Sequence, residues 1–388
     1  MQRVDKYPAV LKGKWFGEDK VRAVRLAGAI IIFAIIWPWA TGPGELSQSS
    51  KINVRHDAKY YQALQQTVTA QTPLAKRVDR IIKDDNFQGT ALVVHHGHII
   101  LQQGYGDANH QKKIKNQAQS VYQIASVQKA MTATLIAREV EKGKLSYDTK
   151  LSKFYPKVPH AKQITIRQLL TMTSGLRQKY QPKTFQSDWQ NVEYSAEHAD
   201  VVAKPGDGKE WSYQPVNYRL LAGILMQLNN ESYSKLFQQV FNDQYHLKML
   251  DYQQFHQSSL ASLGYGDDYD GPRDVDKVEY QRETGTGNVG TSTGMLYRFF
   301  YLLFDKQLVS NPQAMWQTIQ PETYAAGGYQ YPDYKTGHGI FTGYESTVAL
   351  SKDGSEAVIL LSNQYYRGHT YEDLSHHLFH EVTGITIK

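Results

Sequence analysis

The clearest candidates for chemistry are Ser126 and Lys129, three positions apart in Ser126-Val-Gln-Lys129. They stand at the start of a run, residues 126 to 142, in which apolar side chains recur at helical spacing and Gly143 follows the last turn. Residues three apart on a helix are neighbours, so both side chains project from one side of the first turn, where backbone N–H groups are unpaired. A serine hydroxyl attacks a carbonyl at neutral pH only if a base takes its proton, and a lysine is such a base in its neutral form, which burial favours. The pair predicts nucleophilic acyl transfer.

A serine followed three residues later by a lysine is also common at helix starts, so the spacing alone is weak evidence for catalysis. The flanking sequence is more specific. Residues 121 to 129 read Val-Tyr-Gln-Ile-Ala-Ser-Val-Gln-Lys, and residues 164 to 176 read Ile-Thr-Ile-Arg-Gln-Leu-Leu-Thr-Met-Thr-Ser-Gly-Leu. Both segments resemble the class C β-lactamase and DD-peptidase superfamily, within the serine β-lactamase-like and penicillin-binding proteins. The resemblance implies that Ser126 is the nucleophile and Lys129 its base.

A second segment, Pro205 to Leu225, resembles the family stretch in which a loop carrying Tyr-x-Asn leads into a helix. Tyr213 matches the catalytic tyrosine of that stretch. Held near Lys129, its phenol could carry the Ser126 proton to the leaving group and later activate water. The chain has 27 tyrosines, so simple packing at a helix start is the alternative. The flanking match favours catalysis.

The same segment departs from the family at Pro215, where an asparagine is usual. That asparagine normally hydrogen-bonds the substrate's amide and the lysine, and a proline side chain can do neither. An enzyme that cuts a peptide bond has an amide to hold, whereas one that cuts an ester has less. Pro215 is therefore a predicted substrate-contact position, and it favours an ester substrate.

The third family element is a strand with Lys or His, then any residue, then Gly, which faces the serine and supplies the second oxyanion N–H. Lys335-Thr-Gly337 spells one form, and His338-Gly339-Ile340, followed by Gly343-Tyr-Glu-Ser, resembles the other with Ile340 in place of a glycine and one residue deleted. Residues 335 and 338 point to opposite faces of a strand, so only one of them can line the cleft. We favour His338 and Gly339 as substrate-binding residues.

The glycine-rich stretch Gly285 to Gly294 has the appearance of a phosphate cradle, but no lysine follows its last glycine. It matches the family's loop before a helix and is interpreted as a cleft wall.

A predicted turn is flanked by three histidines, His95, His96 and His98, with no carboxylate beside them in the sequence at ligand spacing. They are expected to solvate the turn, and the sequence predicts neither a metal nor a cofactor.

Composition narrows the class of protein. The chain has 388 residues, 41% of them hydrophobic, enough for one domain of about 300 residues plus appendages. It contains no cysteine, which excludes disulfides, thiolate zinc sites and a cysteine nucleophile. Of the net charge of +6, four units lie in residues 1–25, which hold seven basic and three acidic side chains. No basic block of the kind that follows a phosphate backbone remains, so a nucleic-acid partner is not predicted.

Residues 26–44 carry no charge and would reach roughly 28 Å as a helix, enough to cross a hydrocarbon core. The basic residues precede this run, so we expect the N-terminus in the cytoplasm and the rest outside. A cleaved signal peptide is the alternative, but Trp37-Pro-Trp-Ala40 offers no small-x-small cleavage site. The expected organisation is a cytoplasmic segment (1–25), a single-pass anchor in the cell membrane (26–44), an extracellular tether (45–73, with a short helix around 60–68) and a hydrolase domain (74–388).

Periodicity predicts the elements of that domain. They are a helix over 74–82, a hairpin of strands 89–95 and 98–105, a mostly helical middle from 122 to about 308, strands within 337–350 and 357–362, and a closing helix over 371–382. Strands at both ends imply one antiparallel sheet flanked by helices, with a helical subdomain and a cleft where the two meet. This is an α/β (α+β) fold of the β-lactamase/transpeptidase type.

Taken together, these features predict a membrane-anchored, outward-facing serine acyl-hydrolase that acts on D-alanyl groups of the cell envelope. Members of the family from lactobacilli that act as D-alanyl esterases of lipoteichoic acid look similar, and Pro215 favours that ester. The alternatives are a D-Ala-D-Ala carboxypeptidase of the peptidoglycan stem peptide, and a catalytically silent module that binds wall polymer. Retention of Ser126, Lys129 and Tyr213 together argues against the silent module.

Overall fold

The computed structural model describes residues 58–184, 187–206, 211–266, 271–273, 276–365, 368 and 370–387. The predicted cytoplasmic segment and anchor lie outside these residues. Within the described ranges, no helix combines the length and the apolar character needed to cross a membrane.

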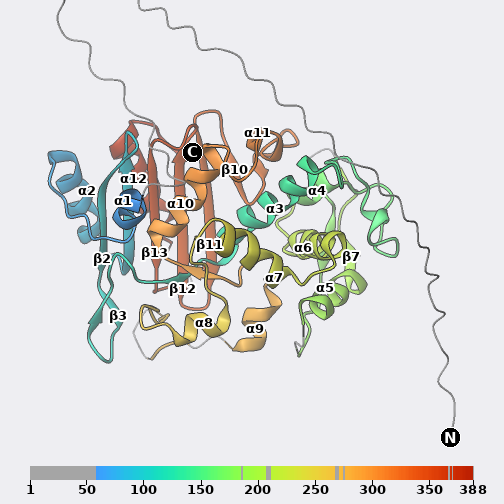
Figure 1. Cartoon of the computed structure of the whole chain (residues 1–388), viewed down its shortest axis with the longest axis horizontal. Coiled ribbons are helices and arrows are strands. Elements are labelled where there is room, and N and C mark those ends of the chain that lie inside the picture. The colour runs from blue at the N-terminus through green and yellow to red at the C-terminus, as the bar shows by residue number, and fades with distance from the viewer. Residues whose placement is uncertain are drawn as a thin grey trace, which may run out of the picture. The chain divides into compact units, whose positions relative to one another are not determined.

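The centre of the fold is a seven-stranded antiparallel sheet whose strands come from both ends of the chain (Figure 1). Its order is β2 (His98–Tyr105), β1 (Gly89–His95), β13 (Ala357–Ser362), β12 (Tyr344–Ser351), β11 (Tyr334–Phe341), β10 (Gly328–Gln330) and β9 (Tyr324–Ala325). Strand β1 pairs with β13, and Gly89 lies opposite Ser362. The predicted sheet built from distant segments is confirmed.

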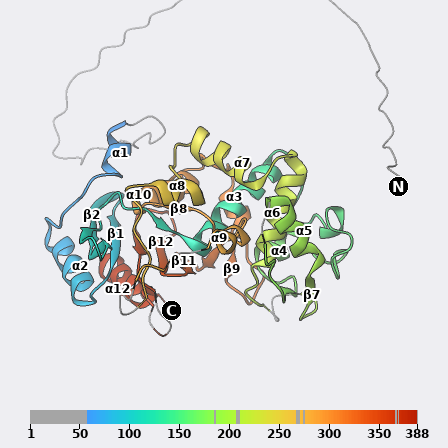
Figure 2. The same cartoon turned by 90° about the horizontal axis from the view of Figure 1, so that it is seen from below.

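Helices cover both faces of this sheet, which explains why β12 and β13 are buried along their whole length. Alternate residues of β1 enter different cores: Ala91 and Val93 pack with α2 (Pro73–Asp84) and α12 (Glu372–Thr383). Leu92 and Val94 pack in the larger core, which includes residues of α10 (Thr293–Phe304). Figure 2 shows α10 on one side of the sheet and α2 and α12 on the other.

A mostly helical region lies beside the sheet, to the right of it in both views (Figures 1 and 2). Helix α6 (Val216–Asn229) packs against α3 (Lys129–Glu141) and α5 (Asp188–Glu197) at its centre. The other helices are α4 (Ile166–Leu170), α7 (Tyr233–Phe237) with the π-helical segment Gln238–Gln244, α8 (Tyr252–Gln257), α9 (Lys277–Arg282), α11 (Pro312–Met315) and the 3₁₀ turn Leu151–Lys153. Short strand pairs complete the fold: β3 (Asp107–Asn109) with β4 (Ile114–Lys115), β5 (Tyr122–Gln123) with β8 (Gly290–Thr291), and β6 (Leu176–Gln178) with β7 (Ala199–Val201).

The predicted helices at residues 74–82 and 371–382 and the predicted hairpin correspond to α2, α12 and the pair β1–β2. The helix after Ser126 differs from the prediction in one respect. Apolar side chains at helical spacing predict a single buried face, but every residue from Lys129 to Ala137 is buried. The sheet lies against its start and α6 along its length, so the helix is central to the domain.

The predicted tether, residues 45–73, also differs where the structure describes it. Helix α1 (Ala58–Ala63) is followed by Leu64, which is fully buried, and by Val68, which exchanges two backbone hydrogen bonds of 2.8 Å with Gln102 of β2. The Gln102 side-chain amide also donates to the Leu64 carbonyl at 2.8 Å. An edge strand has unpaired N–H and C=O groups, and this segment satisfies some of those on β2. Residues 64 and 68 therefore belong to the folded domain.

We expect Leu64→Ala to lower the free energy of unfolding by about 2 to 5 kcal/mol, the usual cost of a cavity left by a buried leucine. Urea denaturation of the full-length chain in detergent measures the change. Leu260→Ala is the matched control, because Leu260 is 44% exposed and its truncation leaves no cavity. Equal stabilities of the two variants would show that the segment before α2 does not contribute to the fold.

Candidate active site

The turn that carries Ser126 is a short 3₁₀ helix, Ala125–Gln128, which continues directly into α3. Ala125 has φ of 47°, a left-handed conformation that non-glycine residues seldom adopt and that often accompanies functional sites. Gly287 lies against it, and a Cβ at Gly287 would come within 3.0 Å of the Ala125 carbonyl carbon. The loop from Gly285, predicted to be a cleft wall, therefore packs directly on the serine turn.

The Lys129 side chain is fully buried, and its Nζ lies 2.8 Å from Ser126 Oγ. Nζ also donates to the Thr286 carbonyl at 3.0 Å. A buried amine that retains its hydrogen-bond partners is held in one position, because leaving them unpaired would be costly. The amine thus lies within proton-transfer distance of the Ser126 hydroxyl.

An ion pair between a buried arginine and a partly exposed glutamate lies next to Lys129. Arg219, whose side chain is 2% exposed, contacts Glu283 at 2.9 Å, and the Thr286 hydroxyl donates to the same carboxylate. Burial raises the pKa of the Glu283 carboxyl, but the Arg219 guanidinium and then the Lys129 ammonium outweigh this effect and lower the pKa below its ordinary value. Glu283 therefore stays anionic and holds the loop whose Thr286 carbonyl receives Lys129.

Tyr213 lies on the open side of Lys129. The Lys129 Nζ is 5.2 Å from the centre of the Tyr213 ring, and 37% of the tyrosine is exposed. The edge of the neighbouring Tyr324 ring packs against Tyr213 at 5.8 Å between centroids. Tyr213 is thus a partly exposed ring next to the buried amine.

Strand β11 approaches the serine turn at Gly339. A Cβ at this position would lie 2.6 Å from the Ile124 carbonyl oxygen and 2.8 Å from the Ser126 nitrogen, so only glycine permits the contact. Beyond Thr336, β11 pairs with β12 but not with β10. Its outer edge at Gly339 therefore has no strand neighbour within the described part of the chain and can offer backbone groups to a ligand.

His338 lies on the opposite face of β11 from Gly339. Its two ring nitrogens contact Glu345 at 2.9 Å and Glu372 of α12 at 3.1 Å. The strand alternation that brings Gly339 to the serine necessarily turns the neighbouring side chain away. The predicted substrate contact by the His338 side chain is therefore corrected: the placement instead makes His338 a link between β11 and α12.

The alternative residue, Lys335, shares the Gly339 face, but its Nζ donates to Gln330 at 2.8 Å and lies 4.3 Å from the centre of the Trp316 ring. Burial, with a smaller contribution from the Lys352 cation, lowers the pKa of Lys335 to about 8. Its ammonium is thus bound within the protein beside α3.

Pro215 is the N-cap of α6, two residues after Tyr213, and its carbonyl accepts from the amides of Tyr218 and Arg219 at 3.0 and 3.1 Å. The nearest asparagine, Asn217, is buried and does not replace the missing amide. Its Oδ1 accepts from Ser174, and its Nδ2 donates to the Gln214 carbonyl. The position therefore offers no side-chain amide to a ligand.

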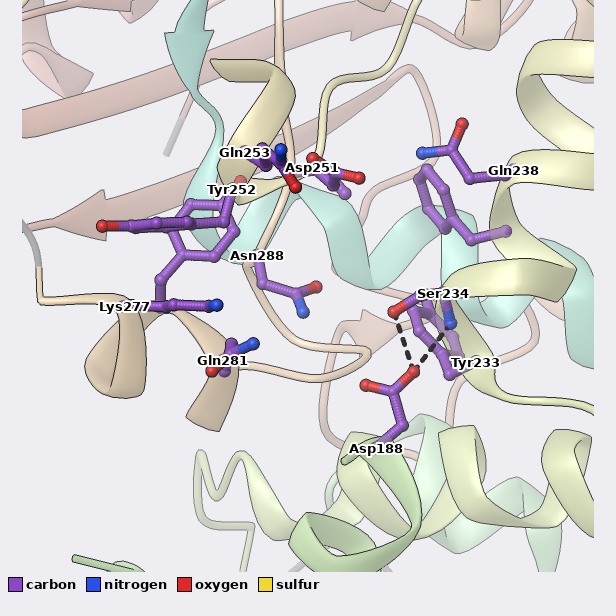
Figure 3. A pocket seen from close by; sticks show the side chains of 13 residues that line it. Asp188, Tyr233, Ser234, Gln238, Asp251, Tyr252, Gln253, Lys277, Gln281 and Asn288 are labelled. Atoms are coloured by element: carbon purple, nitrogen blue, oxygen red, sulfur yellow. Dashed lines mark hydrogen bonds between the residues drawn. The ribbon is translucent and has the colours of Figure 1, made fainter. Parts of the chain in front are cut away.

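A separate pocket of about 230 Å³ lies behind the loop that holds Asn288. Figure 3 shows the polar side chains that line it, among them Asp188, whose carboxylate accepts from both the amide and the hydroxyl of Ser234. Neither Ser126 nor Lys129 lines it. Gln128 connects the two places, since its amide donates to Asn288 at 3.0 Å.

The sheet flanked by helices, with a serine and a buried lysine three residues apart at the start of a central helix, is the arrangement of the β-lactamase family, whose sequence model matches residues 74–381. The chain belongs to this family and is a serine hydrolase.

Among curated relatives, the chain is 27% identical over 293 residues to PbpX of Bacillus subtilis (strain 168), a candidate penicillin-binding protein, covering 74% of this chain and 73% of the relative. It is 25% identical over 328 residues to the teichoic acid D-alanine hydrolase of Staphylococcus aureus, covering 80% of each chain.

Among solved structures, FmtA from Staphylococcus aureus superposes with a TM-score of 0.71 and 20% identity over 83% of this chain and 95% of that one. A D-amino acid amidase from Ochrobactrum anthropi SV3 superposes with a TM-score of 0.66 and 18% identity over 81% and 98%. The two superpositions show a shared fold.

The contacts described above bring Ser126, Lys129, Tyr213 and Gly339 together. Sequence reasoning missed Gly327, where φ is 89° and a Cβ would lie 2.3 Å from the Ala130 nitrogen. It also missed the Arg219–Glu283 pair. Neither had a local signal, because Gly327 and Ala130 lie nearly two hundred residues apart and Arg219 and Glu283 lie 64 residues apart, and a contact between distant segments leaves no spacing pattern in the chain.

We expect Gly339→Ala to slow acylation of Ser126 roughly a hundredfold, the scale of losing one oxyanion donor, because the added methyl group pushes β11 away from the serine turn. The rate of labelling by a fluorophosphonate measures this, with thermal unfolding recorded alongside. Gly337→Ala is the matched control, since its Cβ would meet nothing closer than Val348 at 3.9 Å. Similar labelling rates for both variants would contradict the importance of the close approach.

Proposed function

We propose that this serine hydrolase removes D-alanine from the D-alanyl esters of teichoic acid. The observation that carries the proposal is the buried Lys129 amine 2.8 Å from the Ser126 hydroxyl, beside a strand edge that only a glycine could bring so close. The relative that covers 80% of this chain and is named a teichoic acid D-alanine hydrolase supports the substrate class.

In the proposed reaction, Ser126 Oγ attacks the carbonyl carbon of the D-alanyl ester. The hydroxyl proton passes to the neutral Lys129 amine and through Tyr213 to the departing alkoxide of the polymer, so the C–O bond breaks as the acyl-serine forms. A water molecule, deprotonated by the same pair, then releases D-alanine and restores the Ser126 hydroxyl. The negative charge on the carbonyl oxygen in both steps would be held by backbone N–H groups at Ser126 and on β11.

The choice of an ester over a peptide rests on Pro215. Position 215 carries no amide, and the Asn217 side chain two residues later is already bonded to Ser174 and to the Gln214 carbonyl, so neither of these positions can hold a peptide bond. An ester has no N–H to offer, and its alkoxide leaves more readily than an amine. The cost of the missing contact, about 1 to 3 kcal/mol, should therefore fall on peptide and β-lactam substrates.

A cell-envelope polymer as substrate accords with an uncharged run at residues 26–44 that would anchor the chain in the cell membrane with the domain outside. This localisation is part of the proposal.

Ser126→Ala should abolish D-alanine release because it removes the nucleophile, and the fold should persist because Lys129 keeps its hydrogen bond to the Thr286 carbonyl. Lys129→Met and Tyr213→Phe should each cost roughly a hundredfold or more, the scale of a general acid–base group. The rates are measured on the full-length chain in detergent with purified D-alanylated lipoteichoic acid. Tyr180→Phe, at a 58% exposed tyrosine, serves as the control. Full activity in both the Lys129 and Tyr213 variants would refute the proton relay.

The parent protein should release D-alanine from lipoteichoic acid esters, but little from a D-Ala-D-Ala pentapeptide, and penicillins should acylate it slowly. Pro215→Asn should raise peptide or penicillin reactivity relative to ester by roughly ten- to hundredfold. Pro215→Ala is the control, because it removes the ring without adding an amide. If the parent cleaves the pentapeptide faster than the ester, the carboxypeptidase function replaces the esterase.

A further inference from the structure

One corner of the sheet holds two histidines against a carboxylate. His95 Nδ1 lies 2.9 Å from one oxygen of Glu356, and His96 Nδ1 lies 2.9 Å from the other. The three potential ligand atoms all lie within 4.8 Å of one another. Glu356 was not recognised as a partner in the sequence because it is 260 residues from His96.

The fold fixes these groups from three directions. His95 ends β1, and Glu356 directly precedes β13, whose first residue, Ala357, pairs with Val94. The turn after His95 is tied to the β12–β13 turn, because the Gly97 amide donates to the Ser355 carbonyl at 2.8 Å. The His96 amide also donates to Glu356 at 3.0 Å. The carboxylate and both imidazoles are therefore anchored to the sheet.

The conformation of His96 is unusual for its residue type. It has φ of 51° and Gly97 has φ of 76°, the left-handed pair of a two-residue hairpin, where asparagine, aspartate and glycine are favoured. A histidine here gives up that local preference, and its ring lies against that of His95 with 3.8 Å between centroids. Both Nδ1 atoms face the Glu356 carboxylate, each against a different oxygen.

The separations suit a metal ion. Bonds of about 2.0 to 2.1 Å from zinc to histidine nitrogen or carboxylate oxygen place neighbouring ligand atoms about 2.9 to 3.4 Å apart. Each Nδ1 lies 2.9 Å from its own oxygen of Glu356, which is in that range, and the three ligand atoms lie within 4.8 Å of one another, so a small shift of the exposed His96 ring would bring both nitrogens onto one ion. Two imidazoles and a carboxylate are ligands that zinc and similar transition-metal ions accept, whereas calcium and magnesium prefer oxygen alone.

We propose that His95, His96 and Glu356 form a binding site for a divalent transition-metal ion of the zinc class. On binding, each imidazole carries its proton on Nε2, and the metal takes the place that the Nδ1 proton occupies beside the carboxylate. Remaining coordination positions are open to water or to His98, which is exposed and pairs with His95 across the hairpin. The ion would join the β1–β2 turn to the start of β13.

Isothermal titration of the full-length, tag-free chain with zinc chloride tests the site. The expected result is one ion bound per chain, a higher unfolding temperature with zinc, and a visible absorption spectrum of a nitrogen-ligated ion when cobalt(II) is used instead. Glu356→Gln and His96→Asn should each weaken zinc binding by about tenfold or more. Asparagine suits the left-handed turn, so the His96 variant keeps the fold.

His377→Ala is the matched control. His377 is an exposed histidine on α12, 3.9 Å from the Glu381 carboxylate. It does not belong to the group of His95, His96 and Glu356, so its loss should leave zinc binding unchanged. The proposal is overturned if the parent chain binds no zinc saturably, or if the Glu356 and His96 variants bind it as tightly as the parent. In either case the corner is a hydrogen-bonded turn only. The readouts do not depend on hydrolysis, so they stand apart from the proposed esterase activity.

Discussion

The burial of the Lys129 amine is the constraint on which the rest of the site depends. A lysine with no exposed surface is tolerated only where its amine has partners, and here these are the Ser126 hydroxyl and the Thr286 carbonyl. The carbonyl must in turn be held, and the Glu283 carboxylate does this by accepting from the Thr286 hydroxyl while paired with Arg219. The distance between Lys129 Nζ and Ser126 Oγ is thus maintained by the loop at residues 283–286 and by α6, which carries Arg219.

The absence of side chains is equally important around the serine turn. Gly287, Gly327 and Gly339 each lie so close to backbone atoms of residues 124–130 that a Cβ could not be added without a shift. Protein interiors are close-packed, so a displaced backbone segment carries its neighbours with it. These glycines let the Gly287 loop, the turn between β9 and β10 and strand β11 converge on the start of α3, and this leaves the Ser126 amide beside the open edge of β11.

The contacts of His338, on the face of β11 that points away from the serine, help to keep that edge in place. His338, Glu345 and Glu372 connect the strand to α12, and Glu345 also accepts from the Tyr371 amide at the start of the same helix. The His338 side chain, expected to contact substrate, therefore instead fixes the strand whose Gly339 lies against the serine turn. The other end of the sheet is also held by a segment outside it. Residues 64 to 68, which look like a linker in the sequence, cover the edge of β2.

The sequence by itself determined the family, the hairpin, the terminal helices and the pairing of Ser126 with Lys129, because these depend on spacing within a few residues or on a contiguous motif. The match of its flanking sequence to the family likewise singled out Tyr213, which lies beside Lys129. Only the tertiary structure decided that the helix after Ser126 is buried on all sides, that β11 turns Gly339 and not His338 toward the serine, and that Glu283 supports the loop around Lys129. It also placed Glu356 between His95 and His96. Those outcomes depend on which strand pairs with which and in what register, and a chain segment carries no local record of a partner that lies hundreds of residues away.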